Sequence, residues 1–215
     1  MIKTIKLVIF DLDDTLVSSN INYSQIRRSV ADCFPQPLLE DTIEKTPILQ
    51  LLEKLKQEYP EKYPEGYRIV DEAEKAASLN ARIIEGAEKI PAILKKYAIQ
   101  SVIFTNNSKD TVASYLSKPK FNFLKTFKIF TREDFSHPKP NPEGFISIIE
   151  EFKDKQITKG DTLYIGDSYI DAIAADRADI RFVWFNSRNI DQSLFPSPPF
   201  ATLTDWSDFE SILEG

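Results

Sequence analysis

Short apolar runs alternate with stretches of helical periodicity along most of the chain. The first run, residues 5–10, is rich in β-branched and aromatic side chains, which is typical of a strand buried on both faces. Further runs of this kind cover residues 100–104, 127–130, 162–165, 181–185 and 201–203. Segments with helical patterns separate these runs. The alternation predicts an α/β fold, a Rossmann-like parallel sheet with helices on both faces.

One long segment departs from this alternation. Polar residues at 17–22 follow the first predicted strand, and only helical patterns come after them until about residue 85. One predicted helix has a single apolar face formed by Ile48, Leu51, Leu52 and Leu55. Another covers 67–84, with its inward side formed by Ile69, Ala73, Ala76 and Ala77. We therefore predict an α/β core from 1–17 and 86–215, with a strand-free helical cap at 18–85.

Composition narrows the classes of protein that fit. The chain has 215 residues and a net charge of -6, which argues against a general nucleic-acid binder because such a surface should be basic. Cys33 is the single cysteine, so no disulfide framework forms within the chain. The sequence shows neither a signal-peptide pattern nor a membrane span. We expect a cytoplasmic protein; the sequence leaves its oligomeric state open.

Polar side chains follow three of the predicted strands. Asp11 and Asp13 come after the first strand, Thr105 and Asn106 after the second, and Asp167 with Asp171 after a later one; Lys139 lies in a proline-rich loop. Taken singly, each has a plainer explanation as a turn residue, a helix N-terminal acid or a solvated lysine. The carboxyl ends of parallel strands converge on one edge of a sheet, which predicts a single crevice holding all of them.

These residues resemble the four motifs of the haloacid dehalogenase (HAD) superfamily, which consists mostly of phosphatases. Asp11, Asp13 and Thr15 match the first motif, Thr105 the second, Lys139-Pro140 the third, and Gly166-Asp167 with Asp171 the fourth. Order and approximate spacing agree over nearly the whole core. The helical insert after the first motif resembles the cap of the phosphoglycolate phosphatase-like group.

The resemblance implies a Mg²⁺-dependent phosphatase acting on a small phosphorylated metabolite, with neither nucleic acid nor membrane as partner. Asp11 would be the nucleophile and form an aspartyl-phosphate, and Asp13 would be the acid and base. Thr105, Asn106 and Lys139 would bind the phosphate, with Thr105 and Lys139 also counted as catalytic. Mg²⁺ would bind Asp11, the backbone carbonyl of Asp13, and Asp167, and Asp171 would support that site.

Two alternatives stay open. A phosphomutase of the same fold would use the same residues and differ in how far water is excluded. A non-catalytic binding protein of this fold would usually lack one of the acids, and none is missing here. Dehalogenases are disfavoured because they lack an acid at the position of Asp13. Asp14, at a position that is often Gly in the family, has no predicted role.

Overall fold

The computed structural model describes residues 5–186 and 192–214, and the chain divides into two compact units. One unit comprises Met1–Ser18 and Arg82–Gly215, and the other comprises Ser19–Ala81. We call them the core unit and the inserted unit. Each is described by itself.

The core unit is built on a six-stranded sheet in the order β5-β4-β1-β6-β7-β8. All neighbouring strands run parallel, as the alternating sequence pattern predicted. The strands are β1 (Leu7–Phe10), β4 (Gln100–Phe104), β5 (Lys128–Phe130), β6 (Thr162–Gly166), β7 (Arg181–Phe185) and β8 (Ala201–Leu203). β1 lies between β4 and β6, and all four of its residues are buried because the strand is covered on both faces.

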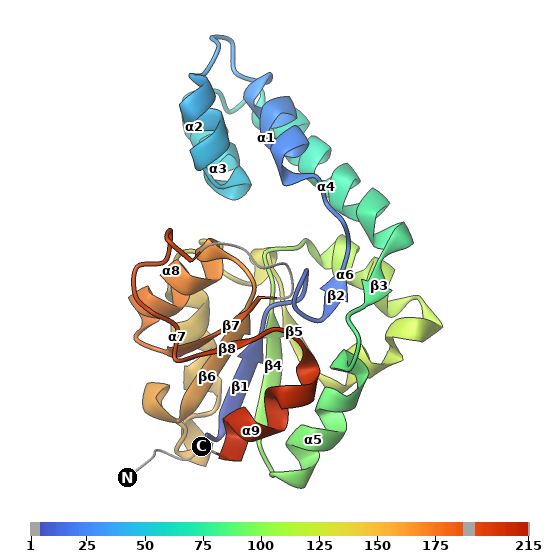
Figure 1. Ribbon diagram of the computed structural model, residues 1–215. Coiled ribbons are helices and arrows are strands. Elements are labelled where there is room, and N and C mark those ends of the chain that lie inside the picture. Colours follow the sequence, from blue (N-terminus) through green and yellow to red (C-terminus); the bar gives the residue numbers. More distant parts are fainter. Residues whose placement is uncertain (1–4, 187–191, 215) are drawn as a thin grey trace. The chain divides into compact units, whose positions relative to one another are not determined.

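Helices cover the two faces of this sheet (Figure 1). They are α5 (Ile90–Lys96), α6 (Lys109–Leu116), α7 (Glu143–Glu151), α8 (Tyr169–Ala178) and α9 (Phe209–Glu214). On one face, α7 and α8 pack with Leu7 and Ile9 of β1 in a single core cluster. On the other, Phe10 makes T-shaped, edge-to-face contacts with the rings of Trp206 and Phe209. The period-2 alternation of β1 thus supplies both layers of core.

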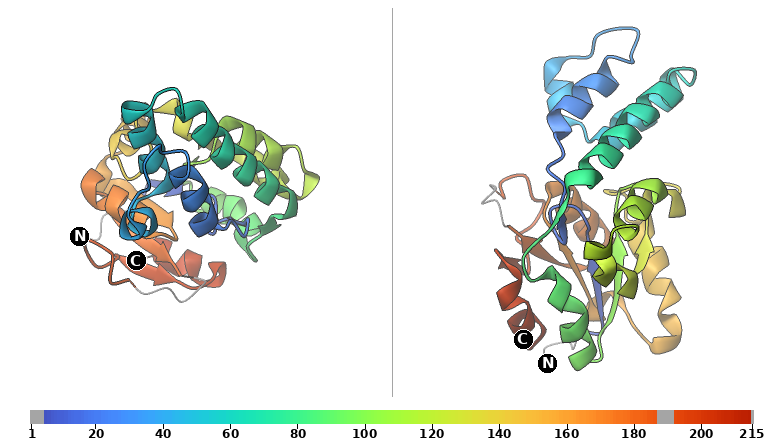
Figure 2. Two further views of the ribbon diagram at one scale, coloured as in Figure 1. Left: turned by 90° about the horizontal axis from the view of Figure 1, so that it is seen from above. Right: turned by 90° about the vertical axis from the view of Figure 1, so that its right-hand side faces the viewer.

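The helices α5 and α9 lie side by side, although they come from distant parts of the sequence (Figure 2, right). The Tyr97 hydroxyl, just after α5, donates a hydrogen bond of 2.9 Å to Glu210 of α9. Lys96 forms an ion pair with the same carboxylate. These contacts join α9, whose Phe209 covers Phe10, to the end of α5.

The chain leaves and re-enters the core unit through a small antiparallel ribbon. It consists of β2 (Val17–Ser18) and β3 (Arg82–Ile83), in which Ser18 pairs with Arg82. The prediction that 18–85 contains no strand is therefore wrong at both ends of that segment. Strands of two residues are too short to produce a periodic pattern, so no hydrophobic pattern indicated them.

The inserted unit contains four helices, α1 (Tyr23–Ala31), α2 (Glu40–Lys45), α3 (Ile48–Glu58) and α4 (Tyr63–Asn80). The predicted face of α3 is confirmed, with Leu51, Leu52 and Leu55 buried. The predicted face of α4 is confirmed in part. Ile69 and Ala73 pack, partly buried, against the core of this unit, but Ala76 is exposed, and the fully buried residues are Gly66, Val70, Glu74 and Ser78. Alanines carry little apolar area, so their spacing was a weak guide to the buried side.

No helix in the described part of the chain is both long enough and apolar enough to cross a bilayer.

Candidate active site

The candidate site lies where three neighbouring strands end. Phe10 of β1 pairs with Ile103 of β4 and Ile165 of β6, so the residues that follow these strands come out at one edge of the sheet. Asp11 continues β1 by donating its N–H to the Ile165 carbonyl at 2.8 Å. Thr105 continues β4 in the same way, toward the Phe130 carbonyl at 3.0 Å. This is the edge at which open parallel sheets bind ligands.

Lys139 is buried at the centre of the site. Its Nζ lies 2.6 Å from Asp11 Oδ1, 2.7 Å from the Tyr164 hydroxyl and 2.8 Å from Asp171 Oδ1. The side chain is 2% exposed. The rings of Phe104 and Tyr164 flank the ammonium, with centroids at 5.3 and 5.4 Å. The loop that carries Lys139 has a cis peptide bond between it and Pro140.

Asp171 connects this lysine to the start of α8. Its Oδ1 accepts hydrogen bonds from Lys139 and Tyr164. Its Oδ2 accepts from the N–H and the hydroxyl of Ser168, which caps α8 in a capping box. A Cβ on Gly166 would lie 2.7 Å from Asp171 Cγ, so only glycine leaves room for this carboxylate. The glycine of the fourth motif thus has a steric explanation.

Three buried carboxylates meet here. Asp11, Asp167 and Asp171 each offer an oxygen, and these atoms all lie within 4.8 Å of one another. With Lys139 as the neighbouring cation, the cluster carries an excess of about two negative charges when all three acids are ionised. Carboxylate oxygens with such an excess are the donor set that a hard divalent cation such as Mg²⁺ prefers. The residues present therefore fit a magnesium ion.

The ionisation of these groups reflects that crowding. Burial raises the pKa of Asp11 to about 7, against the opposing effect of Lys139, while Asp171 raises it further. Burial also opposes charge on Lys139, but Asp11 and Asp171 overcome it and raise the pKa of the ammonium. The pKa of Asp171 is lowered: burial works against ionisation, and Lys139 outweighs it. Of these two acids, Asp171 is thus the more readily ionised when no metal ion is bound.

The side chain of Asp13 engages a different set of partners. Its Oδ1 accepts a hydrogen bond of 2.8 Å from the Tyr115 hydroxyl, and its Oδ2 accepts one from Asn107 Nδ2. Asp13 is 7% exposed. The predicted role of Asp13 at the metal involved its backbone carbonyl only, so the side chain is available for other chemistry.

The loop after β4 is tied to the lysine loop. Asn106 accepts the Lys139 N–H on its side-chain oxygen at 2.9 Å and donates its amide to the Lys139 carbonyl at 3.0 Å. Arg132, which is 7% exposed, donates to the Asn106 carbonyl at 3.1 Å. Thr105 Oγ1 accepts the Asn107 N–H at 3.1 Å. The Asn106 side chain therefore joins two loops, and its predicted contact with phosphate stays a prediction.

Sequence reasoning missed four side chains of this site: Asn107, Tyr115, Arg132 and Tyr164. Tyr164 lies inside an apolar strand and Tyr115 inside a helix, where aromatic residues are ordinary core. Asn107 lies in a loop and Arg132 begins a short 3₁₀ helix, Arg132–Asp134, and neither belongs to a recognisable spacing. The one available signal was the phenol hydroxyl, because a buried Tyr hydroxyl usually finds a hydrogen-bond partner.

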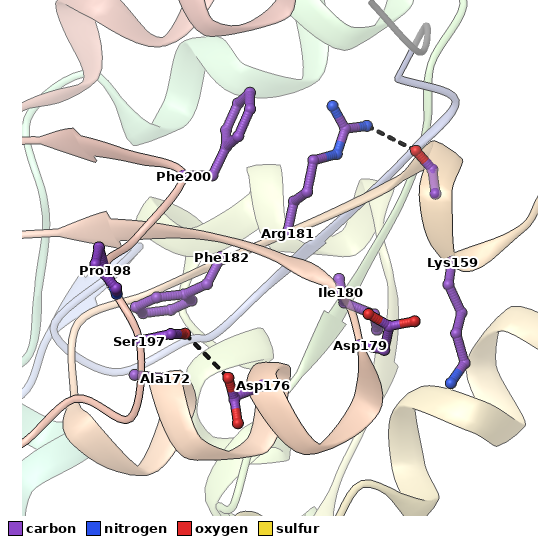
Figure 3. A pocket seen from close by; sticks show the side chains of 11 residues that line it. Lys159, Ala172, Asp176, Asp179, Ile180, Arg181, Phe182, Ser197, Pro198 and Phe200 are labelled. Carbon is purple, nitrogen blue, oxygen red and sulfur yellow. Dashed lines mark hydrogen bonds between the residues drawn. The ribbon is translucent and has the colours of Figure 1, made fainter.

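A separate hollow of about 550 Å³ lies away from these residues, between α8 and the segment leading into β8 (Figure 3). Lys159 and Arg181 line it together with Asp176 and Asp179, so its charges balance. Asp176 accepts from Ser197, and Arg181 donates to the Gly160 carbonyl. None of the predicted site residues lines this hollow.

A parallel α/β sheet that gathers buried carboxylates and a lysine at its carboxyl edge defines a class of α/β proteins with an acidic, metal-compatible centre. Within that class, the chain belongs to the haloacid dehalogenase-like hydrolases, whose family model matches residues 8–185. This match confirms the family and the fold class predicted from the motifs. None of the curated proteins compared with the chain matches it.

Solved structures show the same fold. A hydrolase from Pseudomonas syringae is 23% identical with a TM-score of 0.74, covering 97% of this chain and 98% of that one. A proposed phosphoglycolate phosphatase from Lactobacillus plantarum is 17% identical with a TM-score of 0.70, covering 97% and 99%. The proposed HAD hydrolase YfnB from Bacillus subtilis, bound to magnesium, is 21% identical with a TM-score of 0.67, covering 99% and 100%.

Proposed function

We propose that this hydrolase is a Mg²⁺-dependent phosphatase that cleaves a small-molecule phosphate monoester through an aspartyl-phosphate on Asp11. The observation that carries the proposal is the contact of Lys139 Nζ with Asp11 Oδ1, at 2.6 Å, inside a cluster of buried carboxylates. A buried ammonium there offsets the repulsion between a carboxylate nucleophile and an anionic phosphate. The family membership and the magnesium-bound relative support the same proposal.

The chain's own residues supply the steps. An Asp11 carboxylate oxygen attacks phosphorus, and the bond from phosphorus to the ester oxygen breaks. Asp13 gives its proton to that leaving oxygen, and the alcohol departs. A water molecule then gives a proton to the Asp13 carboxylate while its oxygen attacks phosphorus. The bond from phosphorus to the Asp11 oxygen breaks, which releases inorganic phosphate and restores the Asp11 carboxylate. Thr105 and the backbone beside Asn106 bind the phosphoryl oxygens.

Asp11, Asp167 and the backbone carbonyl of Asp13 would hold the metal ion. Asp171 would support this site indirectly, because its Oδ2 accepts a hydrogen bond from the hydroxyl of Ser168, the residue that follows Asp167. When bound, Mg²⁺ supplies positive charge that neutralises the phosphoryl oxygens and the ionised acids. The donor set is all oxygen, as this ion requires.

We propose that the substrate is a small phosphorylated metabolite of the cytoplasm, and that neither nucleic acid nor a membrane is a partner. Two of the similar structures are proposed phosphoglycolate phosphatases, so phosphoglycolate belongs in any panel of candidates. Phosphosugars and nucleotides complete that panel.

Phosphate release tests the proposal directly. The wild-type protein should release phosphate from at least one ester of the panel with Mg²⁺ and from none in EDTA. Asp11→Asn should abolish release, because an amide does not attack phosphorus, and Asp154→Asn, which changes an exposed acid, should retain it. Turnover by Asp11→Asn would contradict the nucleophile, and inactivity of the wild type on every ester would favour a binding protein.

Metal binding gives an independent measurement. Mg²⁺ should raise the midpoint of thermal unfolding by several degrees, since a ligand at about 100 times its Kd adds about 2.7 kcal/mol and each kcal/mol is worth roughly 2–4 °C in a chain of this size. Asp167→Asn should lose most of that shift, and Asp154→Asn should keep it. Equal shifts in both variants would place the metal elsewhere.

A further inference from the structure

Two side chains outside the family's motifs hold the carboxylate of Asp13 from both sides. The Tyr115 hydroxyl donates to Oδ1 at 2.8 Å, and Asn107 Nδ2 donates to Oδ2. Tyr115 is completely buried and Asn107 is 5% exposed. Two directed donors on the two oxygens of one carboxylate fix the orientation of its plane.

Both donors are themselves fixed by the core unit. Tyr115 lies in the last turn of α6. Helical side chains lean toward the helix N-terminus, so the Tyr115 side chain is directed toward the start of α6, which directly follows the Thr105–Asn107 loop. Its ring makes a T-shaped, edge-to-face contact with Phe121, with centroids 5.4 Å apart. Asn107 donates its N–H to Thr105 Oγ1, and its carbonyl accepts the Arg132 N–H at 3.2 Å.

We infer that Tyr115 and Asn107 are positioning residues for proton transfer by Asp13, an inference that rests on the proposed phosphatase function. They act through Asp13 and touch none of the reacting atoms. Their task is to keep one carboxylate oxygen directed at the leaving oxygen before and after the proton moves. General acid catalysis depends on such geometry because the proton must be within hydrogen-bond reach of its acceptor.

The two contacts differ in kind. Asn107 Nδ2 only donates, so it holds Oδ2 as an acceptor. A phenol hydroxyl donates or accepts by rotating about its C–O bond, so Tyr115 can stay in contact with Oδ1 whether or not Asp13 carries a proton.

The leaving group of the substrate separates this role from a merely structural one. The leaving oxygen of an alkyl phosphate needs a proton from an acid. The leaving group of p-nitrophenyl phosphate is p-nitrophenolate, a stable anion that departs with little need for protonation. Loss of Asp13 orientation should thus lower kcat/KM, which reports the steps up to departure of the alcohol, much more for the alkyl ester than for the aryl ester. Loss of packing or of folded protein would slow both equally.

The test uses Tyr115→Phe, which keeps the ring and removes only the hydroxyl, and Asn107→Ala as a second variant. For each we expect kcat/KM to fall by about tenfold more for the alkyl phosphate found in the panel than for p-nitrophenyl phosphate. Tyr97→Phe is the matched control, since its hydroxyl contacts Glu210 and Glu214 instead. It should leave both rates unchanged.

Equal losses on the two esters, or no loss in either variant, would overturn the inference while the wild-type activity upheld the proposed function. Failure of the wild-type protein on every ester would overturn both together. If Tyr115→Phe unfolds, as a thermal melt would reveal, the Asn107→Ala ratio decides the matter.

Discussion

Asp14 illustrates how a single residue is chosen for its backbone. Its φ is +55°, in the left-handed region, where the chain turns back so that the Asp14 N–H reaches the Val17 carbonyl at 2.7 Å. Glycine adopts this conformation without cost, and Asp and Asn adopt it more readily than other residues. The frequent Gly at this position in the family thus has a backbone explanation. The turn directly follows Asp11 and Asp13, so its shape bears on both.

The backbone explanation predicts an order of stabilities. Asp14→Ala should be less stable than Asp14→Gly by about 1 kcal/mol, because a Cβ at positive φ costs roughly 1–2 kcal/mol and Ala recovers only part of that by restricting the unfolded chain. Both variants lack the aspartate side chain, so their difference isolates the backbone. Urea unfolding measures it. An alanine variant as stable as the glycine variant would refute the explanation.

The pKa of Asp11 predicts a pH dependence of stability in EDTA. Its folded pKa of about 7 lies above the ordinary value of 3.8, so between these values the folded state holds a proton that the unfolded state has lost. Stability from this group is therefore complete below about pH 4 and falls as the pH rises toward 7. Asp11→Asn has no such proton.

The free energy of unfolding of the wild type minus that of Asp11→Asn should accordingly decrease from pH 4.5 to 7 and level off above it. Urea titrations in EDTA at several pH values give this difference. Subtracting the variant cancels groups that behave alike in both proteins. A difference that increases with pH would contradict the raised pKa.

At this scale the sequence predicted the residues whose chemistry needs a charge, and missed those that orient them. Asp11, Lys139 and Asp171 are polar groups at strand ends or in loops, where burial of a charge needs a reason. Tyr115 and Tyr164 lie inside apolar patterns, and their hydroxyls contact Asp13 and Lys139 only because of what the tertiary fold places opposite them. No spacing within the sequence encodes that meeting.

Among the elements, α7 shows how helix packing reaches the site. Gly144 in its first turn lies against Phe104, and a Cβ there would lie 2.3 Å from Phe104 Cζ. That ring is held by Phe135 and Phe145, with centroids 5.1 Å away in both cases, so it has little room to move. Its centroid is also 5.3 Å from Lys139 Nζ. The approach of α7 therefore bears on the environment of the lysine.

Gly144→Ala should overpack this contact and destabilise the protein by about 1–3 kcal/mol. It should also lower phosphatase activity, because a displaced Phe104 ring disturbs Lys139. Thermal unfolding and phosphate release measure the two effects. Ser147→Ala, at an exposed position of the same helix, should change neither. A Gly144→Ala protein of wild-type stability would mean that α7 shifts freely.

The elements also show where hydrophobic patterns in the sequence stop predicting which residues are buried. The strands of the sheet and the leucine face of α3 were predicted because large apolar side chains recur with a clear period. The face of α4 was predicted only in part because its pattern rested on alanines: Ile69 and Ala73 pack against the core, but the fold fully buries Val70, Glu74 and Ser78. Glu74 is a charged residue that no hydrophobic pattern would place inside. In such a helix the buried face is determined by tertiary packing, and the local amino-acid composition predicts it poorly.

For the whole molecule, the ribbon of β2 and β3 defines how the inserted unit joins the core unit. Ser18 and Arg82 are paired neighbours, and residues 19–81 form one continuous segment between them. The sheet, the carboxylate cluster and Lys139 all belong to the core unit. The six strands of the sheet thus come from both sides of the insert in the sequence, with β1 before it and the other five after it.

Replacement of residues 19–81 by Asn-Gly should therefore leave a core unit that folds. These two residues favour the tight turn that closes an antiparallel pair, and Ser18 and Arg82 are such a pair. We expect cooperative thermal unfolding and a circular dichroism spectrum that has lost the helical signal of α1 to α4. A broad, non-cooperative transition would show that the core unit depends on the insert.

The same ribbon has a consequence for inheritance. Entry and exit of the insert lie at neighbouring backbone positions, so an exchanged segment need only bring its own two ends together. A recombination event between the codons of Ser18 and Arg82 would give the hydrolase a new insert without moving a strand of its sheet. The catalytic centre and the inserted unit can in this way follow separate evolutionary histories within one gene.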